Sequence, residues 1–333
     1  MHSVKPVDVA AKTARRTSAY LLLLACSATL LALSLSSGSV NVTTGEMWTC
    51  LTRQSHGMAC EVIFNLRLPR ALAAFAAGGL LALAGTLMQV LLRNPLADPF
   101  VMGVSGGAAA MALAAISLGL GAFAVDVAAT AGALLATALV FLLARGEGGW
   151  VPTRLLLTGV VIAAGTGALV STLLILSDEV QMRGMLFWLM GDLSLSGSGW
   201  PLLLMLLLAT LLTYPFARHL NLLARGDLQA QLLGAPVRGL RIGIFVGGSV
   251  LTAVAVTAVG TIGFIGLVTP HMVRLLLGAD HRVTLPATAL LGGALLMSAD
   301  LCARTWFAPR QLPVGALTAL VGVPVFLILM KRS

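Results

Sequence analysis

The residues that could do chemistry are concentrated in a short polar segment between Arg93 and Pro99. This segment reads Arg-Asn-Pro-Leu-Ala-Asp-Pro, and small residues follow it at Gly103, Ser105, Gly106 and Gly107. Its prolines and charges interrupt long apolar stretches. Irregular backbone at membrane depth is tolerated only where protein covers it or where it lines an aqueous cavity. The segment therefore predicts a functional loop beside a water-filled path.

The chain lacks the residue patterns of an enzyme. A Walker A loop needs a lysine at the phosphates, but the three lysines, Lys5, Lys12 and Lys331, all lie near the ends of the chain. The cysteines and histidines show no metal-ligand spacing, and no nucleophile, base and orienting group converge at one depth. We therefore expect no catalytic, cofactor-binding or metal-binding residue here, and no ATP hydrolysis by the Walker A route.

The acidic residues do not predict an ion-coupled carrier. Such carriers keep acids deep in the bilayer for coupling, whereas the acids of this chain fall at or near the predicted helix ends: Asp98, Asp126, Asp178, Glu179, Asp192 and Asp300. Asp300 and Arg304 stand one helical turn apart, which predicts a local ion pair. The pattern favours a pathway whose energy comes from elsewhere, with an ion-coupled carrier or a channel as the alternative from another class.

Composition predicts the elements that position these residues. Of the 333 residues, 58% are hydrophobic and 10% are charged, and the mean hydropathy is +0.98. A water-soluble fold could not cover its surface with so few polar residues. Almost all of nine charge-free stretches reach the roughly 20 residues that cross a bilayer as a helix. They are 17–45, 71–92, 99–125, 127–144, 155–177, 193–217, 242–273, 283–299 and 311–330.

The longest stretch, 242–273, contains a break at Gly260, Gly263 and Gly266. Dividing it there gives ten helices, the second continuing past Arg274. An even number places both basic termini on the cytoplasmic side, which then collects 15 of the 21 Lys and Arg residues. Because this charge is spread over short loops, it does not predict a nucleic-acid surface. We expect an all-α, polytopic protein with a single transmembrane domain over 1–333.

The N-terminal apolar run is interpreted as a retained first helix, because it exceeds the roughly 7 to 15 residues of a signal-peptide core. The outer segment that follows, 39–68, contains Cys50 and Cys60. This pair forms a disulfide if the segment faces an oxidising periplasm, and its spacing permits closure without requiring it. Cys26 and Cys302 lie within or beside apolar stretches and are interpreted as buried packing residues.

The long cytoplasmic loop at 218–241 contains a short helix pattern over 226–236. Asp227 gives the pattern an acidic first turn, and a glycine followed by a proline ends it. Three leucines would form a small apolar face exposed to the cytoplasm, namely Leu228, Leu232 and Leu233. Such a face predicts a protein partner. The alternative is an interfacial helix that rests on lipid headgroups.

These motifs, in this order, resemble the FecCD-type permeases of ABC importers, which carry cobalamin, haem and ferric siderophores across the bacterial inner membrane. The resemblance covers nearly the whole chain. It rests on Arg67-Leu68-Pro69-Arg70, 85–89, 93–99, 226–234, the run from Gly263 to His271 with Arg274, 280–282, and Leu312-Pro313-Val314-Gly315 with Gly322 and Pro324.

The resemblance implies a homodimer of ten-helix subunits with the pathway on its two-fold axis. Two ATPase subunits, which bind ATP and Mg, would lie beneath the dimer, and a periplasmic binding protein would lie above it. By the same resemblance, the coupling helix that docks into the ATPase comprises Gly226, Asp227, Leu228, Gln231, Leu232, Leu233 and Gly234. The chain would carry no cofactor of its own.

The resemblance also assigns the remaining site residues. Arg67, Arg70 and Arg304 match periplasmic arginines that meet acidic residues of the binding protein, where complementary charge orients docking. Anchoring at the lipid headgroups is the alternative for Arg67 and Arg70. The cytoplasmic gate would consist of Asn94, Pro95, Leu96, Pro152, Thr153 and Arg154.

The fifth helix would line the pathway with a ridge of small residues at Gly159, Ala163 and Gly167. Close helix packing explains such a ridge equally well. After this helix come Met182, Met185, Phe187, Trp188 and Met190, which could face a porphyrin or corrin ring or form an interfacial amphipathic helix. In this family selectivity resides mainly in the binding protein. We expect haem or another iron chelate as the cargo, with cobalamin as the alternative.

Overall fold

The computed structural model describes residues 9–38, 42–52, 57–146, 149–194, 197–308 and 310–331. Lys5 and Arg332, which contributed to the prediction for the termini, lie outside these ranges. Within the described residues, seven helical segments are long and apolar enough to cross a membrane, and three more apolar helices are shorter. The prediction of an all-α fold with ten apolar helices is confirmed. A two-residue antiparallel hairpin, β1 (Arg145–Gly146) and β2 (Gly149–Trp150), is a minor addition.

Most helices lie within the predicted stretches, but two boundaries were wrong: α1 begins before the stretch 17–45, and α6 begins inside the stretch 99–125, because a charge at Asp126 does not end a helix. The long apolar segments contain α1 (Val9–Ser36), α4 (Leu68–Leu92), α6 (Ala122–Leu143), α7 (Pro152–Leu176), α9 (Gly199–Thr213), α12 (Val237–Val259) and α14 (His281–Thr305). The shorter apolar helices are α5 (Val104–Ser117), α13 (Ile265–Leu277) and α15 (Val314–Met330). The connecting elements are α2 (Thr44–Leu51), α3 (Met58–Glu61), η1 (Val62–Arg67), η2 (Pro99–Met102), α8 (Glu179–Met190), η3 (Tyr214–Phe216), α10 (Ala217–Ala224) and α11 (Asp227–Leu232).

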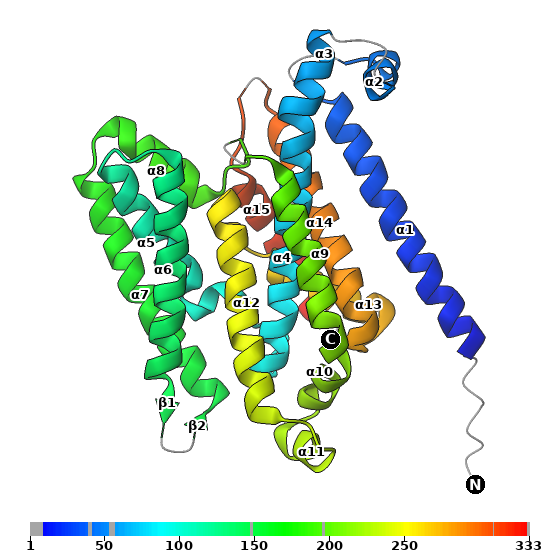
Figure 1. Cartoon of the computed structure of the whole chain (residues 1–333), viewed down its shortest axis with the longest axis vertical. Helices are drawn as coiled ribbons and strands as arrows, with labels where there is room; N and C mark the ends of the chain where they lie inside the picture. The colour runs from blue at the N-terminus through cyan, green and yellow to red at the C-terminus, as the bar shows by residue number, and fades with distance from the viewer. Residues whose placement is uncertain are drawn as a thin grey trace.

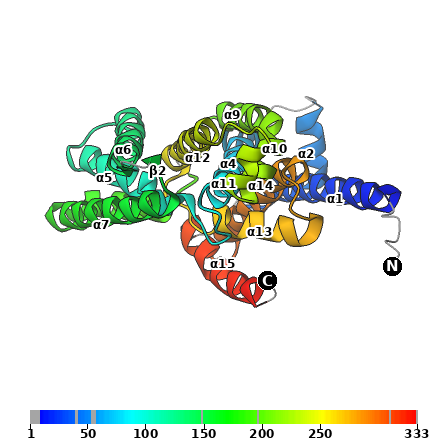
Figure 2. The ribbon, with the colours of Figure 1, turned by 90° about the horizontal axis from the view of Figure 1, so that it is seen from below.

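Helix α4 is the centre of the bundle, with α9, α12, α13 and α14 packed around it (Figures 1 and 2). Small residues allow α4 to occupy the centre of the bundle, because they let two helix backbones approach closely. A side chain at Gly78 would overlap Gly292 of α14, and one at Gly85 would overlap the backbone of Gly266 of α13. Nearly every residue of α4 is buried as a result.

The break predicted within 242–273 is confirmed. Helix α12 ends at Val259, and α13 begins at Ile265 and continues past Arg274 to Leu277. Gly260 has a φ of +74°, which a residue without Cβ adopts readily. Asp192 N–H donates to the Val259 carbonyl at 3.0 Å, so the break also joins the segment that follows α8. The glycines here serve a turn and close helix packing.

The two ends of the bundle differ. One end carries α2 and α3 and is called the α2–α3 end; the other carries α11 and the β1–β2 hairpin and is called the α11 end (Figure 1). At the α2–α3 end, Cys50 and Cys60 form a disulfide, which settles the alternative that the sequence left open. The pair is buried together with Leu35, Val42 and Ile63.

One prediction for the peripheral helix α1 was wrong. Cys26, expected to be a buried packing residue, is exposed, while Cys302 in α14 is partly buried. The reason is that α1 lies along the edge of the bundle, away from its centre (Figure 2), so much of its surface is left uncovered within one chain. Hydropathy gives the same value for a lipid-facing position and a core position, so it could not separate the two.

Candidate functional site

A helix forms where the coupling helix was predicted, and it has the predicted exposed face. Helix α11 spans Asp227–Leu232, and Leu228, Leu232 and Leu233 are 70%, 78% and 65% exposed. Its opposite side is held to the bundle by Ala230, which is fully buried. Because three large apolar side chains at a polar end of the bundle are uncovered, this end of the chain fits a protein partner.

The ends of α11 are shaped by glycines with positive φ. Gly226 has a φ of +122° and precedes the helix, and Gly234 has a φ of +79° and follows it. The Gly234 N–H donates to the Gln231 carbonyl and the Ala235 N–H donates to the Ala230 carbonyl, both at 2.9 Å. These bonds satisfy the last carbonyls of the helix in a left-handed C-terminal cap. The local sequence therefore fixes a compact, protruding helix.

Asp227 joins α11 to two other elements at the α11 end. Its carboxylate accepts a hydrogen bond from Arg93 Nη2 at 3.3 Å, and Arg93 is the C-terminal cap of α4. The same carboxylate oxygen pairs with Arg241 on α12. The sequence analysis interpreted Asp227 only as an acidic residue in the first turn of a helix. It did not predict the contact with Arg93, because the two residues are 134 positions apart and no local pattern connects them.

The first predicted gate segment follows Arg93 directly. Asn94, Pro95 and Leu96 are exposed, and the Asn94 side chain accepts a hydrogen bond from the Leu96 N–H at 2.9 Å, which closes a tight turn. The chain then enters η2, where the Asp98 carboxylate accepts from the Phe100 N–H at 2.8 Å. This segment is a defined turn between the end of α4 and η2.

The second predicted gate segment is the first turn of α7. Pro152, Thr153 and Arg154 follow the β1–β2 hairpin, with Pro152 at the first helical position, where a missing N–H costs nothing. Among the described residues, no hydrogen bond or ion pair joins this segment to Asn94, Pro95 or Leu96. Within the described part of the chain the two segments are therefore not bonded to each other, and their joint role as a gate stays a prediction.

The three predicted docking arginines meet at the α2–α3 end, but they are bonded inside the chain. Arg67 Nη1 donates to the Leu35 carbonyl at 2.6 Å, and Arg304 Nη2 donates to the Ser34 carbonyl at 2.6 Å. These bonds hold the end of α1 against α14 and the π-helical segment η1 before α4. Arg67 is only 5% exposed, so its anchoring partner is protein backbone.

Arg70 and Arg304 share one buried carboxylate. Asp300, which is 1% exposed, lies 2.8 Å from Arg70 Nη2 and 3.6 Å from Arg304 Nε. The predicted pair between Asp300 and Arg304 is confirmed, while the shorter contact with Arg70 was not predicted. Removing one partner of a buried pair leaves an uncompensated charge, which is costly. These arginines therefore neutralise a buried charge within the bundle, whatever they also contact outside it.

A cavity at the α2–α3 end exposes parts of all three arginines. It has a volume of about 780 Å³ and is lined by Arg67, Arg70 and Arg304 with Asn65, Trp200 and Gln311, among others. Arg70 Nη1 also donates to Gln311 Oε1 at 3.1 Å. A positively charged hollow of this size can receive an acidic side chain. The cavity keeps the docking role open as a prediction.

The predicted ridge on α7 divides into two parts. A side chain at Gly159 would lie 2.6 Å from the Val101 carbonyl of η2, so this glycine serves close packing within the chain. Ala163 is partly buried beside Gly106 of α5. A methyl group added at Gly167 would meet no atom within 4 Å, and this glycine lies on an exposed face. Only the Gly167 part of the ridge is free within one chain to face a pathway.

The methionine and aromatic cluster predicted over 181–191 forms α8. Met185 is fully buried, whereas Met182, Phe187 and Met190 are close to 37% exposed. The C-terminal end of α8 contacts the break between α12 and α13, where Thr261 Oγ1 donates to the Leu189 carbonyl. The Val314 N–H donates to the Gly191 carbonyl at 3.3 Å. Helix α8 therefore joins α15 to the break at the α2–α3 end.

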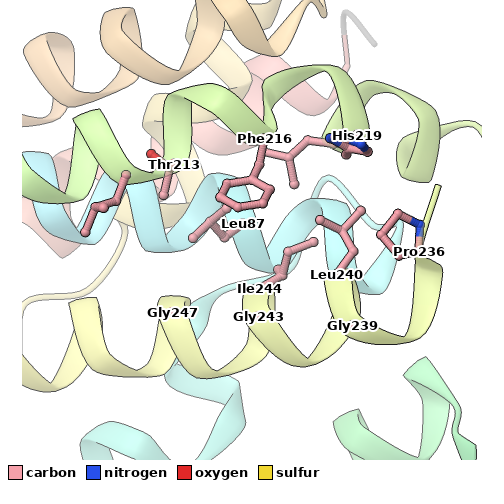
Figure 3. Close-up of a pocket in the computed structure, with 12 residues that line it drawn as sticks. Leu87, Thr213, Phe216, His219, Pro236, Gly239, Leu240, Gly243, Ile244 and Gly247 are labelled. Carbon is pink, nitrogen blue, oxygen red and sulfur yellow. The ribbon is translucent and has the colours of Figure 1, made fainter.

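An apolar groove between α4, α9, α10 and α12 reaches the α11 end (Figure 3). Its volume is about 370 Å³, and its lining includes Gly239, Gly243 and Gly247 of α12, with Phe216 and His219 opposite. A methyl group added at any of these glycines would meet no atom within 4 Å. The groove is lateral and nearly without polar groups, so it does not provide the polar path that the loop at Arg93 predicts.

The whole bundle, with its two polar turns and its protruding helix, matches a known family of membrane proteins. Residues 22–332 match the FecCD transport family. This chain belongs to the FecCD transport family. It is a membrane permease of the ABC type, and the resemblance carried by the loops at 93–99 and 226–234 is confirmed.

Two relatives show how widely the family's cargo varies. The chain is 41% identical over 311 residues to the hemin transport system permease HmuU of Yersinia pestis, covering 90% of this chain and 91% of the relative. It is 40% identical over 275 residues to the cobalamin import system permease BtuC of Halobacterium salinarum, covering 81% of this chain and 73% of the relative. The two identities are nearly equal, so they do not distinguish haem from cobalamin.

The fold of the permease is also that of a solved transporter. An inward-facing structure described as a metal-chelate type ABC transporter has 32% sequence identity and a TM-score of 0.83, and the match covers 94% of this chain and 98% of that one. Because the match covers nearly all of both chains, the two proteins share one overall architecture.

Proposed function

We propose that this permease is the membrane-spanning subunit of an ABC importer that moves haem or another iron chelate from the periplasm to the cytoplasm. The observation that carries the proposal is the exposed leucine face of α11 in a chain of the FecCD family. This face offers a partner a docking surface at one end of an otherwise membrane-embedded bundle. The proposal places the α11 end and both termini in the cytoplasm, as the distribution of Lys and Arg indicates.

The energy for transport would come from a separate subunit. Two ATP-binding subunits would contact α11, one on each copy of a homodimer, and hold ATP and Mg. In this arrangement the permease has no covalent step and binds no cofactor. Closure of the ATP-binding subunits would move α11, and the turns at Asn94–Leu96 and Pro152–Arg154 would open and close the cytoplasmic side.

The α2–α3 end would receive the loaded binding protein. The cavity lined by Arg67, Arg70 and Arg304 supports this placement because it presents positive charge to acidic side chains. The internal bonds of these arginines fix their positions before docking, which reduces the entropy lost when the partner binds. Between the two ends, Gly159, Ala163 and Gly167 mark the helix proposed to line the pathway.

The cargo proposal rests on relatedness. A relative named as a hemin permease, at 41% identity, supports haem, and a relative named as a cobalamin permease, at 40% identity, supports the alternative. Both contain a large tetrapyrrole-type ring, and α8 presents Met182, Phe187 and Met190 near the mouth of the proposed pathway. Methionine and aromatic side chains adapt to such apolar faces.

Reconstituted liposomes test the proposed function. The permease, its ATP-binding subunits and the binding protein encoded beside it would be assayed for ATP-dependent uptake of haem and of cobalamin. We expect uptake only with all three components. Uptake that proceeds without the ATP-binding subunits, or that an ion gradient drives, would contradict the proposal and support a carrier or channel.

A substitution on α11 sharpens this test. Leu232→Glu places a charge in the exposed leucine face, so we expect at least about a tenfold loss of co-purified ATP-binding subunit. Leu118→Glu is the matched control, because Leu118 is similarly exposed, at 75%, but directly follows α5, whose last residue, Ser117, accepts a hydrogen bond from Gln181 of α8. Equal retention of the ATP-binding subunit by both variants would count against α11 as the docking element.

A further inference from the structure

Three charged side chains connect α11 with the end of α4 and with α12. The Asp227 carboxylate faces Arg93 Nη2 at 3.3 Å on one side and Arg241 on the other. Asp227 is the first residue of α11, Arg93 caps the C-terminal end of α4, and Arg241 lies in the second turn of α12. One carboxylate therefore links three elements that are separate in the sequence.

The backbone on both sides of this link is arranged for close approach. Arg93 has a φ of +49°, a left-handed conformation that residues with a side chain seldom adopt. A methyl group at Gly226 would lie 3.7 Å from Arg93 Nη1, and Gly226 itself has a φ of +122°. Helix α4 thus ends in a turn that sends the Arg93 guanidinium towards the start of α11.

The link connects the exposed leucine face of α11 with the first predicted gate segment. Leu228, the next residue after Asp227, begins the exposed leucine face, and Asn94, the next residue after Arg93, begins the first predicted gate segment. The Asn94–Leu96 turn is closed by its own side-chain hydrogen bond, and the Asn94 N–H donates to the Gln89 carbonyl of α4 at 3.1 Å, which ties the turn to the end of α4. The ion pair between Asp227 and Arg93 therefore connects α11 directly to the residue that precedes this turn.

We propose that Asp227 is a positioning residue that transmits motion of α11 to the Asn94–Leu96 turn by pairing with Arg93, while Arg241 holds the same carboxylate to α12. This inference rests on the proposed function, because it assumes that α11 docks to an ATP-binding subunit. It predicts reciprocity: nucleotide bound to that subunit changes the state of the turn, and the state of the turn changes nucleotide affinity.

The surroundings of the link determine how it responds to salt. The side chains of Arg93 and Asp227 are 40% and 30% exposed, whereas that of Arg241 is 14% exposed. Exposed ion pairs are screened at high ionic strength, and buried ones are screened much less. The contact between Arg93 and Asp227 is therefore the salt-sensitive half of the link, and the contact with Arg241 is the more persistent half.

Accessibility of the turn tests the proposal without knowledge of the cargo. Leu96→Cys, in a background with Cys26→Ser and Cys302→Ser, would be labelled with a membrane-impermeant maleimide in inside-out vesicles that also contain the ATP-binding subunits. We expect a non-hydrolysable ATP analogue to change the labelling rate about fivefold, within the range usual for coupled sites. Adding Asp227→Asn should abolish that change while the ATP-binding subunits still co-purify.

Three further variants show whether the response depends on this contact. Arg93→Gln leaves α11 and its pairing with Arg241 intact, so it removes only the link to the turn and should abolish the response to the same extent as Asp227→Asn. The double variant should be no worse than either single variant, as expected for two residues that act through one contact. Asp280→Asn is the matched control, since Asp280 also pairs with an arginine, Arg16, and its carboxylate's hydrogen bonds among the described residues go to Asn221 and Arg282 and not to α11 or the turn.

The outcomes separate this proposal from the proposed function. A full nucleotide response in assembled Arg93→Gln or Asp227→Asn complexes would overturn the role of Asp227, as would a labelling rate of the parent Leu96→Cys chain that ignores nucleotide. Failure of the parent chain to bind any ATP-binding subunit would instead overturn the proposed function.

Discussion

At the scale of single residues, the surroundings of each charge decide its effect. Asp300 shares its buried carboxylate with two arginines, whereas the Asp98 carboxylate accepts a hydrogen bond from the Phe100 N–H. Burial raises the pKa of Asp98 to about 6, although that hydrogen bond acts in the opposite direction. The folded protein therefore holds the Asp98 proton more tightly than the unfolded chain does.

This difference predicts a pH dependence of stability. Between about pH 4 and pH 6 the unfolded state binds fewer protons at this site than the folded state, so Asp98 makes the protein less stable as pH rises, and the cost persists above pH 6. Asp98→Asn keeps an oxygen that can accept from Phe100 and removes the charge. We expect it to raise the free energy of unfolding by about 1–2 kcal/mol at pH 7.5, with little effect near pH 4.

Thermal unfolding in detergent at the two pH values measures this effect. Asp280→Asn provides a control of opposite sign. Burial raises the pKa of Asp280, but hydrogen bonds from Asn221 and from the Arg282 N–H, with the charges of Arg16 and Arg282, outweigh burial and lower it. Asp280 thus stabilises the folded state at pH 7.5 and loses this effect as pH falls. A destabilising Asp98→Asn at pH 7.5 would contradict the assignment of a costly buried charge.

At the scale of elements, glycines in two apolar helices have opposite surroundings. Gly85 of α4 lies against the backbone of Gly266 of α13, and the contact allows α4 to occupy the centre of the bundle. Gly243 of α12 faces the lateral groove, where an added methyl group would meet no atom within 4 Å (Figure 3). Sequence alone presents both as glycines in apolar helices.

These surroundings predict opposite results for the same substitution. Gly85→Ala forces α4 and α13 apart and should destabilise the protein by at least about 1–3 kcal/mol. Gly243→Ala restricts the unfolded chain and meets no obstacle, so it should be neutral or stabilising by about 0.5–1 kcal/mol. Melting temperatures of the two variants in detergent would be compared. A strong loss of stability or assembly in Gly243→Ala would show that another helix occupies the groove in the complex.

At the scale of the whole molecule, α7 and α1 lie on opposite sides of the bundle (Figure 2). Both are long apolar helices with uncovered surface, and α15 also has exposed apolar residues such as Leu320 and Leu327. Apolar surface of this kind is covered by lipid or by another protein. The proposed homodimer covers the side of α7 that bears Gly167 and leaves α1 to face lipid.

Cross-linking with a bis-maleimide tests this arrangement, because a disulfide would not reach across a pathway that admits a macrocycle. In a background without Cys26 and Cys302, the reagent should join two copies of Gly167→Cys into a covalent dimer in membranes, because they would face each other across the pathway. Leu22→Cys on α1 is the matched control, since Leu22 is 71% exposed, and it should give less than about a tenth of the dimer. Preferential cross-linking at Leu22 would contradict the proposed interface.

The sequence by itself determined the number of helices, the break at Gly260 and the exposed leucines of α11. Hydropathy and turn residues are local properties, and each such feature depends only on how a short segment partitions between lipid, water and a turn. The same reasoning left the disulfide undecided and misjudged Cys26, because burial within the bundle is not a local property.

Only the tertiary structure brought Arg70 to Asp300 and Arg93 to Asp227, pairs that are 230 and 134 residues apart. It also showed that Arg67 and Arg304 bond to the backbone at the end of α1. Such contacts depend on which helices pack side by side and at what rotation, and these are set by the close approach of small residues across α4. Hydropathy does not predict which helices pack side by side, because many arrangements of ten apolar helices bury the same segments equally well.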